Sequence, residues 1–523
     1  MLRKLIPALF GLIMVVAAPV ASAQEMSVDT SEPVQELSVD EKINEFFKNP
    51  TEWAFKGIFF EPFSIGGKGI PFILIWLVLA GIFLTIFFKF INLRSFGLAF
   101  RTVRGKYSSP DDPGEITHFQ ALTAALSATV GLGNIAGVAI AISKGGPGAA
   151  FWMIVLGFLG MTTKFAECTL GVKYREIDED GKVRGGPMHY LTKGLKEKGM
   201  GSFGKVLAVF FAILCIGASL GGGNMFQINQ ACSQFINVSG GEESILADAR
   251  WVFGLVVAIL IAVVIIGGIT RIASVTSRLV PLMCITYLLG AVAVLGANIT
   301  AIPDAIGVIV SSAFQTEAYV GGMIGAMLVG IQRGTFSNEA GIGSAPIAHA
   351  AVKTKRPASE GLVALLEPFT DTVIVCTMTA LVIVVTGNYG EEFSGASYGQ
   401  AIEITSNSFA TVITWFPFVL FVAVLLFAIS TLISWSYYGQ QAWAYIFGKS
   451  KQADLAYKIL FCAVIIAGSA LSLGVVTDFS DAMLLAMCFP NLIGVFILLP
   501  VVKSELKLFV DHANKVDAGE EEP

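Results

Sequence analysis

Long apolar stretches recur along most of the chain and are separated by short polar segments. Many are about 18 to 25 residues long, the length that an α-helix needs to cross the roughly 30 Å hydrocarbon core of a bilayer. The pattern predicts about eleven membrane-spanning helices, near 71–90, 119–143, 148–171, 204–227, 251–269, 276–297, 319–345, 362–386, 412–446, 457–476 and 482–502. We therefore expect an all-α polytopic protein embedded in a lipid bilayer.

The loops between the predicted spans alternate in charge. Every second loop is basic, whereas loops such as 388–409 are acidic or neutral. Because basic loops stay in the cytoplasm, we expect a multi-pass protein of the inner (plasma) membrane, with an extracytoplasmic mature N-terminus and a cytoplasmic C-terminus. The basic loops carry Arg94, Arg101, Arg104, Lys106, Lys173, Arg175, Lys182, Arg184, Lys193, Lys196, Arg271, Arg278, Lys353, Lys355, Arg356, Lys449 and Lys451.

The two ends of the chain differ from the apolar part. Residues 1–23 have a basic start, an apolar stretch and a small-residue ending, which is typical of a cleaved signal peptide. An uncleaved signal anchor is the alternative. Residues 24–70 form an acidic segment that we expect outside the cytoplasm. The transporter-like apolar part, 71–503, is followed by an acidic cytoplasmic tail, 504–523.

Composition narrows the function classes. Only 14% of residues are charged, against roughly 25% in soluble domains. The formal charge of −5 lies mainly in tails and loops and indicates no nucleic-acid partner. Four histidines and no Cys/His ligand spacing argue against a His-rich metal centre, so we expect no cofactor.

The segment 127–153 predicts an interrupted helix. It is apolar but has glycines at 131, 133, 137, 145, 146 and 148. In hydrocarbon a helix can break only where protein or a water-lined cavity surrounds it, and freed carbonyls and N–H groups can then bind a cation and a carboxylate. The break offers side-chain oxygens and exposed backbone from Ser127, Thr129, Leu132, Gly133 and Asn134.

A second interrupted segment about five spans later predicts an inverted repeat. Near its end the span 319–345 places Arg333, Ser337, Asn338 and Glu339 at positions where apolar residues would be expected. For Arg333 and Glu339 a structural ion pair and a direct ligand role both stay open. For Asn338 we favour a functional role.

Other polar residues lie within predicted spans. Ser430 and Thr431 share an apolar run with Trp435, which lies one turn beyond Thr431 on the same helix face. Gln227 ends another span. Asp371 is the most embedded acid, and a cation ligand, a proton carrier and the partner of Arg333 all remain open. For Lys164 and Glu167 we expect snorkelling or mutual pairing.

The runs "VGLGNIAGVAIAISKGGPGAAFWM", "RGTFSNEAGIGSAPIAHA" and "LLFAISTLISWSYYG" resemble the alanine or glycine:cation symporter family, from about residue 71 onward. The family signature usually has Trp where Ile154 follows Met153 here, at a packing position. The resemblance implies a leucine-transporter-type fold: two five-helix inverted repeats plus one extra helix.

The resemblance also implies roles for individual residues. Carbonyls of Ser127 and Val130 with hydroxyls of Ser430 and Thr431 would bind sodium. N–H groups of Leu132 and Gly133 would take the substrate carboxylate. The remaining predicted pocket residues are Thr129, Asn134, Gln227, Phe336, Asn338, Thr431 and Trp435, and possible coupling residues are Asp371, Arg333 and Glu339.

Secondary active import of a small neutral amino acid, alanine or glycine, with sodium as the coupling ion is thus the leading hypothesis. Proton coupling through Asp371 or Glu339 is the nearest rival. An intramembrane hydrolase using Glu339 and His349 lacks a supporting motif, and a passive channel lacks a charged ring or repeated carbonyl filter. We therefore expect no enzyme.

Overall fold

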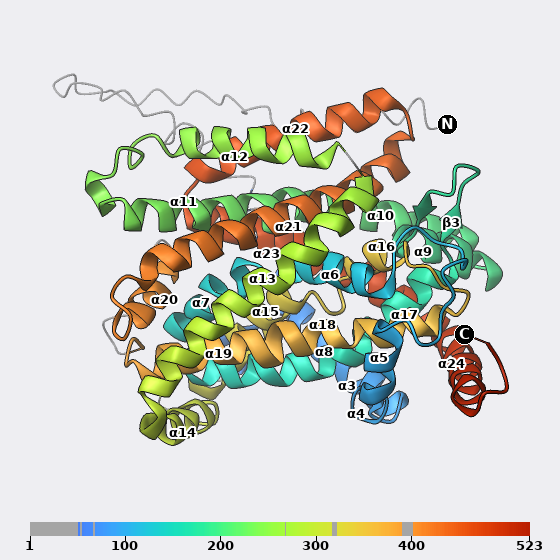
Figure 1. The fold of residues 1–523 in the computed structure, drawn as a ribbon, viewed down its shortest axis with the longest axis horizontal. Coiled ribbons are helices and arrows are strands. Elements are labelled where there is room, and N and C mark those ends of the chain that lie inside the picture. Colours follow the sequence, from blue (N-terminus) through green and yellow to red (C-terminus); the bar gives the residue numbers. More distant parts are fainter. Residues whose placement is uncertain are drawn as a thin grey trace.

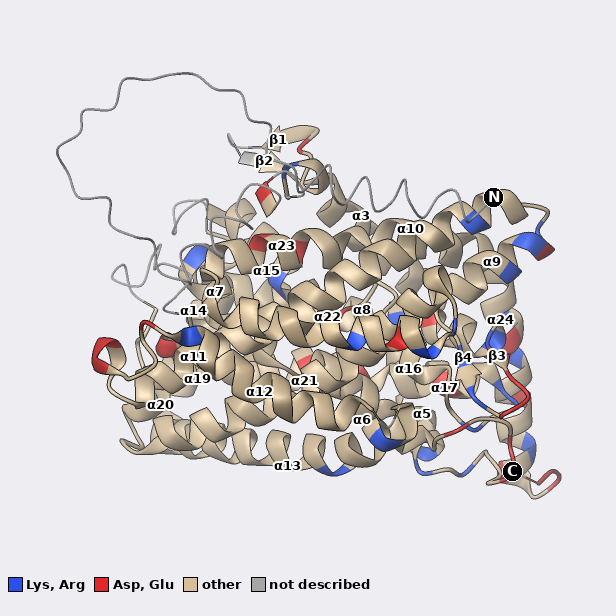
Figure 2. Cartoon of the chain, turned by 90° about the horizontal axis from the view of Figure 1, so that it is seen from above, with Lys and Arg blue, Asp and Glu red and all other residues tan. Residues whose placement is uncertain are grey.

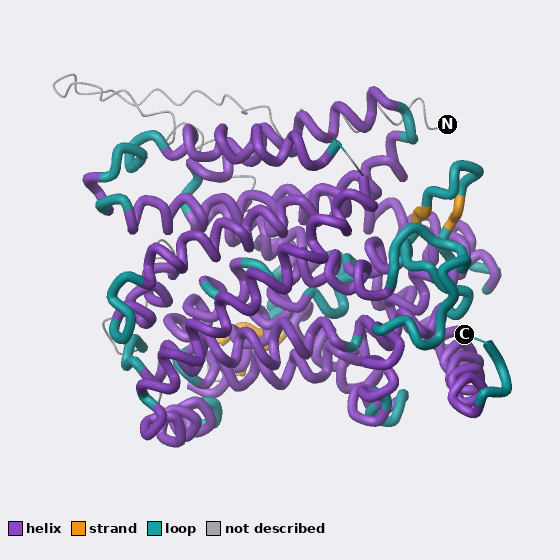
Figure 3. The backbone as a smooth tube through the Cα atoms, in the orientation of Figure 1, coloured by secondary structure: helices purple, strands orange, loops and turns teal. Residues whose placement is uncertain are grey.

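The computed structural model describes residues 51–522 apart from 53–54, 66–67, 267, 316–321 and 390–400. The predicted signal peptide, most of segment 24–70 and part of the loop 388–409 lie outside the described residues. Helices run along the length of the molecule and loops gather at its two ends (Figure 3). Two short antiparallel strand pairs, β1 (Phe63–Ile65) with β2 (Lys68–Ile70) and β3 (Glu176–Ile177) with β4 (Val183–Arg184), complete the described secondary structure.

The first half of the chain folds into a bundle whose first core helix is broken (Figure 1). A capping box of Thr117 and Gln120 starts that helix. The elements are α3 (Phe72–Phe87), α4 (Ile91–Arg94), α5 (Phe96–Val103), α6 (His118–Thr129), η1 (Leu132–Asn134), α7 (Ala136–Gly145), α8 (Gly148–Lys173), α9 (Pro187–Glu197), α10 (Gly201–Leu220), η2 (Gly221–Met225), α11 (Phe226–Val238), η3 (Gly241–Glu243), α12 (Arg250–Ile265) and α13 (Gly268–Ala297).

The second half repeats the arrangement with another broken helix. Its elements are η4 (Ile299–Ala301), α14 (Ile302–Ser312), α15 (Gly322–Asn338), α16 (Ala345–His349), α17 (Pro357–Ala364), α18 (Leu366–Pro368), η5 (Phe369–Cys376), α19 (Thr377–Val385), α20 (Ala401–Ala410), α21 (Phe416–Phe447), α22 (Lys451–Ala470), α23 (Leu473–Ala486) and α24 (Cys488–Ala518). The two halves pack against each other through the broken helices: α15 packs against α7, and α6 packs against the continuous helix α21.

The predicted helical membrane architecture is confirmed, but the number of spans is not. Within the described ranges seven helices are long and apolar enough to cross a bilayer, and the bent pair of α6 with η1–α7 makes eight. The other predicted spans coincide with the shorter α3, α12 and α15. The last predicted span is part of a longer unit, since α24 continues to Ala518 through the expected tail.

The surface of the bundle is apolar where lipid would contact it. Val256, Ile259 and Val263 on α12 and Ile285 and Leu289 on α13 are exposed. Lys and Arg gather toward the end that carries β3, β4 and α9 (Figure 2). We call this the basic end, and the end near α11, α14 and α20 the opposite end (Figure 1).

Candidate functional site between two broken helices

The first break places backbone that is not part of a helix against α21 and α11. The axes of α6 and η1–α7 differ by 58° across the break. Val130, fully buried, ends α6, and Gly131 follows in an extended conformation. A Cβ on Gly131 would lie 2.7 Å from Thr431 Oγ1 and 3.1 Å from Gln227 Oε1. Glycine is therefore required here so that the interrupted backbone can touch both side chains.

Hydroxyl groups and carbonyls meet where α6 ends beside α21. Thr431 Oγ1 donates to the Ser127 carbonyl at 3.0 Å, and Ser127 Oγ donates to the Ser430 carbonyl at 2.7 Å. Ser434 Oγ lies 3.0 Å from Ser127 Oγ, and Ser430 Oγ donates to the Phe427 carbonyl at 2.8 Å. These four residues, Ser127, Ser430, Thr431 and Ser434, form the hydroxyl cluster. Neutral oxygens of this kind suit a hard cation.

A second polar cluster lies on the other side of the break. Asn134 Nδ2 donates to Asp371 Oδ1 at 2.5 Å and to Ser337 Oγ at 3.0 Å. Ser337 and Thr372 hydroxyls donate to Asp371 Oδ2 at 2.8 and 2.7 Å. Asn134, Ser337, Asp371 and Thr372 form the carboxylate cluster. Asp371 lies on the π-helical η5, a geometry that is frequent at functional sites.

The carboxylate of Asp371 is fully buried and is held by neutral donors. Arg333 does not pair with Asp371, because it forms an ion pair with Asp481 on α23. The predicted alternative of an Arg333–Asp371 pair is therefore wrong, whereas the structural ion pair expected for Arg333 is formed with Asp481. Because a buried charge without a counter-ion is costly, Asp371 is suited to bind a cation or a proton.

A small closed pocket lies beside the hydroxyl cluster. Its volume is about 10 Å³, at the lower limit of what one water molecule requires. The predicted residues Thr129, Gly133, Gln227, Phe336 and Trp435 line it, together with Ala128, Gly222, Glu339 and Leu484. The pocket therefore has to open before any amino acid can enter.

Glycines of η2 let aromatic rings approach this pocket. A Cβ on Gly223 would lie 2.2 Å from Trp435 Cγ, and one on Gly222 would lie 3.4 Å from Phe336 Cε2. The ring of Phe336 packs edge-on against Phe226 at 4.9 Å. Rigid rings and absent side chains together fix the size of the pocket.

The second break places Glu339 at the base of the pocket. Glu339 has a φ of +56°, which is uncommon for a residue with a side chain and occurs mainly in turns and at functional sites. Trp435 Nε1 donates to Glu339 Oε1 at 3.0 Å, and Ser344 Oγ donates to Glu339 Oε2. Glu339 thus orients the indole that lines the pocket. It is bonded to these groups and not to His349, whose own ring nitrogens face Glu360 and Glu367.

Three predicted substrate groups have intramolecular partners. The Leu132 N–H donates to Gln227 Oε1 at 3.1 Å, so a carboxylate would have to displace this amide. Thr129 Oγ1 lies 3.3 Å from the Ala125 carbonyl of its own helix. Asn338 donates to Thr372 Oγ1 at 3.2 Å and caps the Ala340 N–H, so the structure places it beside the carboxylate cluster and off the pocket lining.

Buried ion pairs lie on both sides of the pocket. Arg333 and Gln332 bind Asp481 one turn from Phe336 toward the start of α15. Lys164 is fully buried and binds Glu367 at 3.2 Å, while Glu167 accepts from Asn491. The expectation that Lys164 and Glu167 snorkel or pair with each other is wrong. Asp481, Glu360 and Glu367 were missed, although each is an ionisable residue inside or beside an apolar run.

Comparison with known proteins supplies the family. Residues 64–522 match the sequence model of the Sodium:alanine symporter family. The chain is 42% identical over 440 residues to a sodium/alanine symporter, AgcS, from Methanococcus maripaludis, covering 84% of this chain and 94% of that protein. It is 34% identical over 452 residues to a probable sodium/glutamine symporter, GlnT, from Bacillus subtilis, covering 86% and 89%.

The fold has a solved counterpart. The structure of MhsT in complex with L-phenylalanine aligns with a TM-score of 0.52 at 16% identity, covering 74% of this chain and 99% of MhsT. The neighbour supports the predicted leucine-transporter-type fold. With two broken helices facing each other around a buried pocket and a family match along most of its length, the chain belongs to the sodium:alanine symporter family, whose members are secondary transporters of amino acids with a cation.

Proposed function

We propose that this protein imports a small neutral amino acid, alanine or glycine, together with sodium, by alternating access across the inner (plasma) membrane. The basic end faces the cytoplasm in this proposal. The observation that carries it is the convergence of Ser127, Ser430 and Thr431, whose carbonyls and hydroxyls meet where α6 ends. A cation bound there would sit next to the backbone break that faces the pocket.

The substrate carboxylate would bind at the N–H groups of Leu132 and Gly133, where η1 begins. This end of a helical segment is positively polarised and favours anions. The amide of Gln227 now occupies the Leu132 N–H and would turn away as the carboxylate arrives. The zwitterion loses much of its hydration on entry, so a bound sodium ion and the helix ends must replace it together.

The pocket walls support a small side chain. Trp435 and Phe336 close the space that a longer substrate would need, and they contact the glycines of η2. The relatives carry names for alanine and for glutamine transport, so the size of the accepted side chain is the property to test. We expect alanine and glycine to compete for uptake and glutamine to compete poorly.

Asp371 would bind a second sodium ion with Asn134 and Ser337. The carboxylate supplies the charge and Ser337 supplies a hydroxyl oxygen. Asn134 faces Asp371 with its Nδ2, and its Oδ1 accepts from the Gly131 N–H, so its side chain would have to turn to offer an oxygen. Each positive charge that moves inward gains about 2.3 kcal/mol per 100 mV of membrane potential. Two bound sodium ions would therefore increase the concentration ratio that import can reach.

Uptake into proteoliposomes tests the proposal. Purified protein is reconstituted with an inward sodium gradient and labelled alanine, and potassium or choline replaces sodium in matched vesicles. We expect accumulation only with sodium, and none in vesicles without protein. Equal accumulation in potassium would overturn the sodium proposal.

Proton coupling through Asp371 or Glu339 is the alternative. The observation that supports it is that Asp371 is buried and has no cationic partner in the described part of the chain. An inward pH gradient in sodium-free vesicles distinguishes the two. Accumulation under that gradient alone would establish the alternative in place of sodium.

A further inference from the structure

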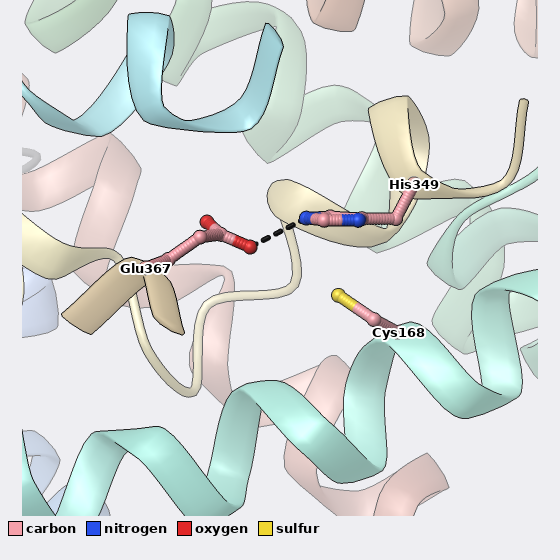
Figure 4. A group of neighbouring side chains, drawn as sticks. All are labelled: Cys168, His349 and Glu367. Atoms are coloured by element: carbon pink, nitrogen blue, oxygen red, sulfur yellow. Dashed lines mark hydrogen bonds and ion pairs between the residues drawn. The ribbon is translucent and has the colours of Figure 1, made fainter. Parts of the chain in front are cut away.

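A chain of buried ionisable side chains runs from the basic end toward the pocket. Ser108 Oγ lies 2.7 Å from His118 Nε2, and His118 Nδ1 binds Glu360 Oε2. His349 lies 2.5 Å from Glu360 Oε1 through Nδ1 and 2.5 Å from Glu367 Oε1 through Nε2. Lys164 Nζ completes the chain at Glu367 Oε2. Figure 4 shows the ring of His349 directed at Glu367.

The hydrogen bonds require one more proton than neutral groups carry. A neutral imidazole has one N–H, yet both ring nitrogens of His349 face carboxylate oxygens. On the oxygens that face away from His349, Glu367 Oε2 accepts from Lys164 and Glu360 Oε2 faces His118 Nδ1, so each carboxylate already has a second donor group. The additional proton therefore belongs on His349 as an imidazolium. His118 can stay neutral, since Nδ1 donates to Glu360 and Nε2 accepts from Ser108.

With that proton the buried charges balance. Glu360 and Glu367 each carry one negative charge, and His349 and Lys164 each carry one positive charge. Glu360, Glu367, His349 and Lys164 are all fully buried. Loss of the proton would leave a net negative charge without water, which is costly. The protonated state and the closed arrangement therefore stabilise each other.

A metal is a poor occupant of this place. Cys168, His349 and Glu367 offer ligand atoms within 4.8 Å of one another (Figure 4). Both nitrogens of His349 are already engaged by carboxylates, and the ammonium of Lys164 lies 3.2 Å from Glu367. A divalent cation would face that ammonium at close range.

We propose that Glu360, His349 and Glu367 form a proton-binding site that fastens the basic-end halves of both broken helices, α6 through His118 and α16 through His349, to α17 and α18. Opening of the basic end releases the proton. This role rests on the proposed alternating access, whereas the proton site itself does not.

Charged and titratable groups surround His349 from every neighbouring element. Helix α8 contributes Lys164, Glu167 and Cys168, α6 contributes His118, and α17 and α18 contribute Glu360 and Glu367. Helix α21 contributes Tyr438, whose buried hydroxyl lies in the field of Glu367 and has no hydrogen-bond partner among the described groups, and the turn before α16 contributes Glu339. Arg175, which follows α8, donates to the Ala350 carbonyl and lies in the field of Glu360. The two carboxylates are the groups that contact the ring directly.

Solid-state NMR of the full-length protein with isotope-labelled histidine tests the site without any transport. The chain has four histidines, and a free imidazole is mostly neutral at about pH 8. We expect one histidine to keep both ring nitrogens protonated at about pH 8 and to disappear from the spectrum of His349→Gln. Four neutral rings in the wild type, or persistence of the signal in His349→Gln, would overturn the proton site.

Two further variants keep this test sound. His189→Gln is the matched control, because burial lowers the pKa of His189 to about 4 and this residue lies on α9, away from the chain of ion pairs. It should retain the doubly protonated signal. In Glu360→Gln all four histidines remain, but His349 loses one carboxylate, so its signal should become that of a neutral ring.

The pH dependence of exchange tests whether the bound proton holds the basic end closed. Labelled-alanine exchange is measured with equal pH on both sides, from about pH 6 to about pH 9, at saturating sodium. We expect the wild-type rate to rise at least about threefold as the proton leaves, and the His349→Gln rate to change less than about 1.5-fold. Identical pH profiles in the two proteins would contradict the role of the proton in holding the basic end closed, while leaving the NMR evidence for the proton site unchanged.

Discussion

The hydroxyl cluster and the carboxylate cluster lie on two sides of one helix break, and they differ in charge. Hydroxyls of Ser127, Ser430 and Thr431 rotate to donate to nearby carbonyls, so this cluster is satisfied without a cation. Asp371 carries a charge that neutral donors only partly stabilise. The difference suggests that the first cluster sets sodium affinity, whereas the second requires a bound cation for the closed state.

The largest effect should come from Asp371→Asn. This change removes the only formal charge of the carboxylate cluster while keeping its shape, and we expect sodium-driven alanine uptake to fall at least about 100-fold. Initial uptake rates in proteoliposomes give the value, and exposed Asp111→Asn serves as the control. Wild-type uptake by Asp371→Asn would break the proposed division between the clusters.

Gly223→Ala should have the next largest effect. It changes the pocket but neither cluster, so it separates their contributions. The new methyl group would overlap Trp435, and overpacking of this kind typically costs about 1–3 kcal/mol. We expect alanine affinity to fall about tenfold with unchanged sodium affinity in a thermal-shift titration. Gly307→Ala, which has open space around its Cβ, is the control. A parallel loss of sodium affinity would mean that pocket and clusters are not separable.

Thr431→Ala tests the hydroxyl cluster directly. It removes an oxygen that faces the Ser127 carbonyl, and we expect half-saturating sodium to rise about five- to tenfold while the maximal rate changes little. Thr335→Ala is matched, since that buried hydroxyl bonds to the Ile331 carbonyl of its own helix. An unchanged sodium requirement would remove Thr431 from the cation site.

The smallest effect should come from Ser434→Ala. The Ser434 hydroxyl contacts Ser127 Oγ and the Ala124 carbonyl, one turn beyond Ser430. We expect half-saturating sodium to rise only about twofold. A larger change than in Thr431→Ala would mean that Ser434 is itself a ligand and that the cluster lies closer to the basic end.

The sequence predicted the parts of the fold that have a local signal. Glycines 131 and 133 indicated the first break. Ser127 lies against Thr431 and Ser430, the residues that the family resemblance grouped, but Ser430 contacts it through its carbonyl, and its hydroxyl bonds to the Phe427 carbonyl. Buried ionic partners were harder. Arg333 meets Asp481 across 148 residues, and Asn134 meets Asp371 across 237. A charge in an apolar run indicates a partner but does not say which helix face it occupies, so pairing depends on packing.

Helix boundaries were likewise predicted only where the sequence carries a local signal. Apolar length predicted separate spans at 251–269 and 276–297, whereas α13 begins at Gly268 and α24 extends to Ala518. The short α14 and α20 gave no span-length signal, so they were not predicted. The grouping of the His349 chain was missed because its five ionisable residues come from five elements, α6, α8, α16, α17 and α18. A search for every ionisable residue inside apolar runs would have found most of them.

Sodium flux driven by alanine tests the central claim of coupling most directly. Proteoliposomes are loaded with equal sodium on both sides, and an inward alanine gradient is applied while radioactive sodium entry is followed. Coupled transport predicts sodium entry in the wild type, none in Asp371→Asn, and none in vesicles without protein. Alanine entry without any movement of sodium would contradict the account.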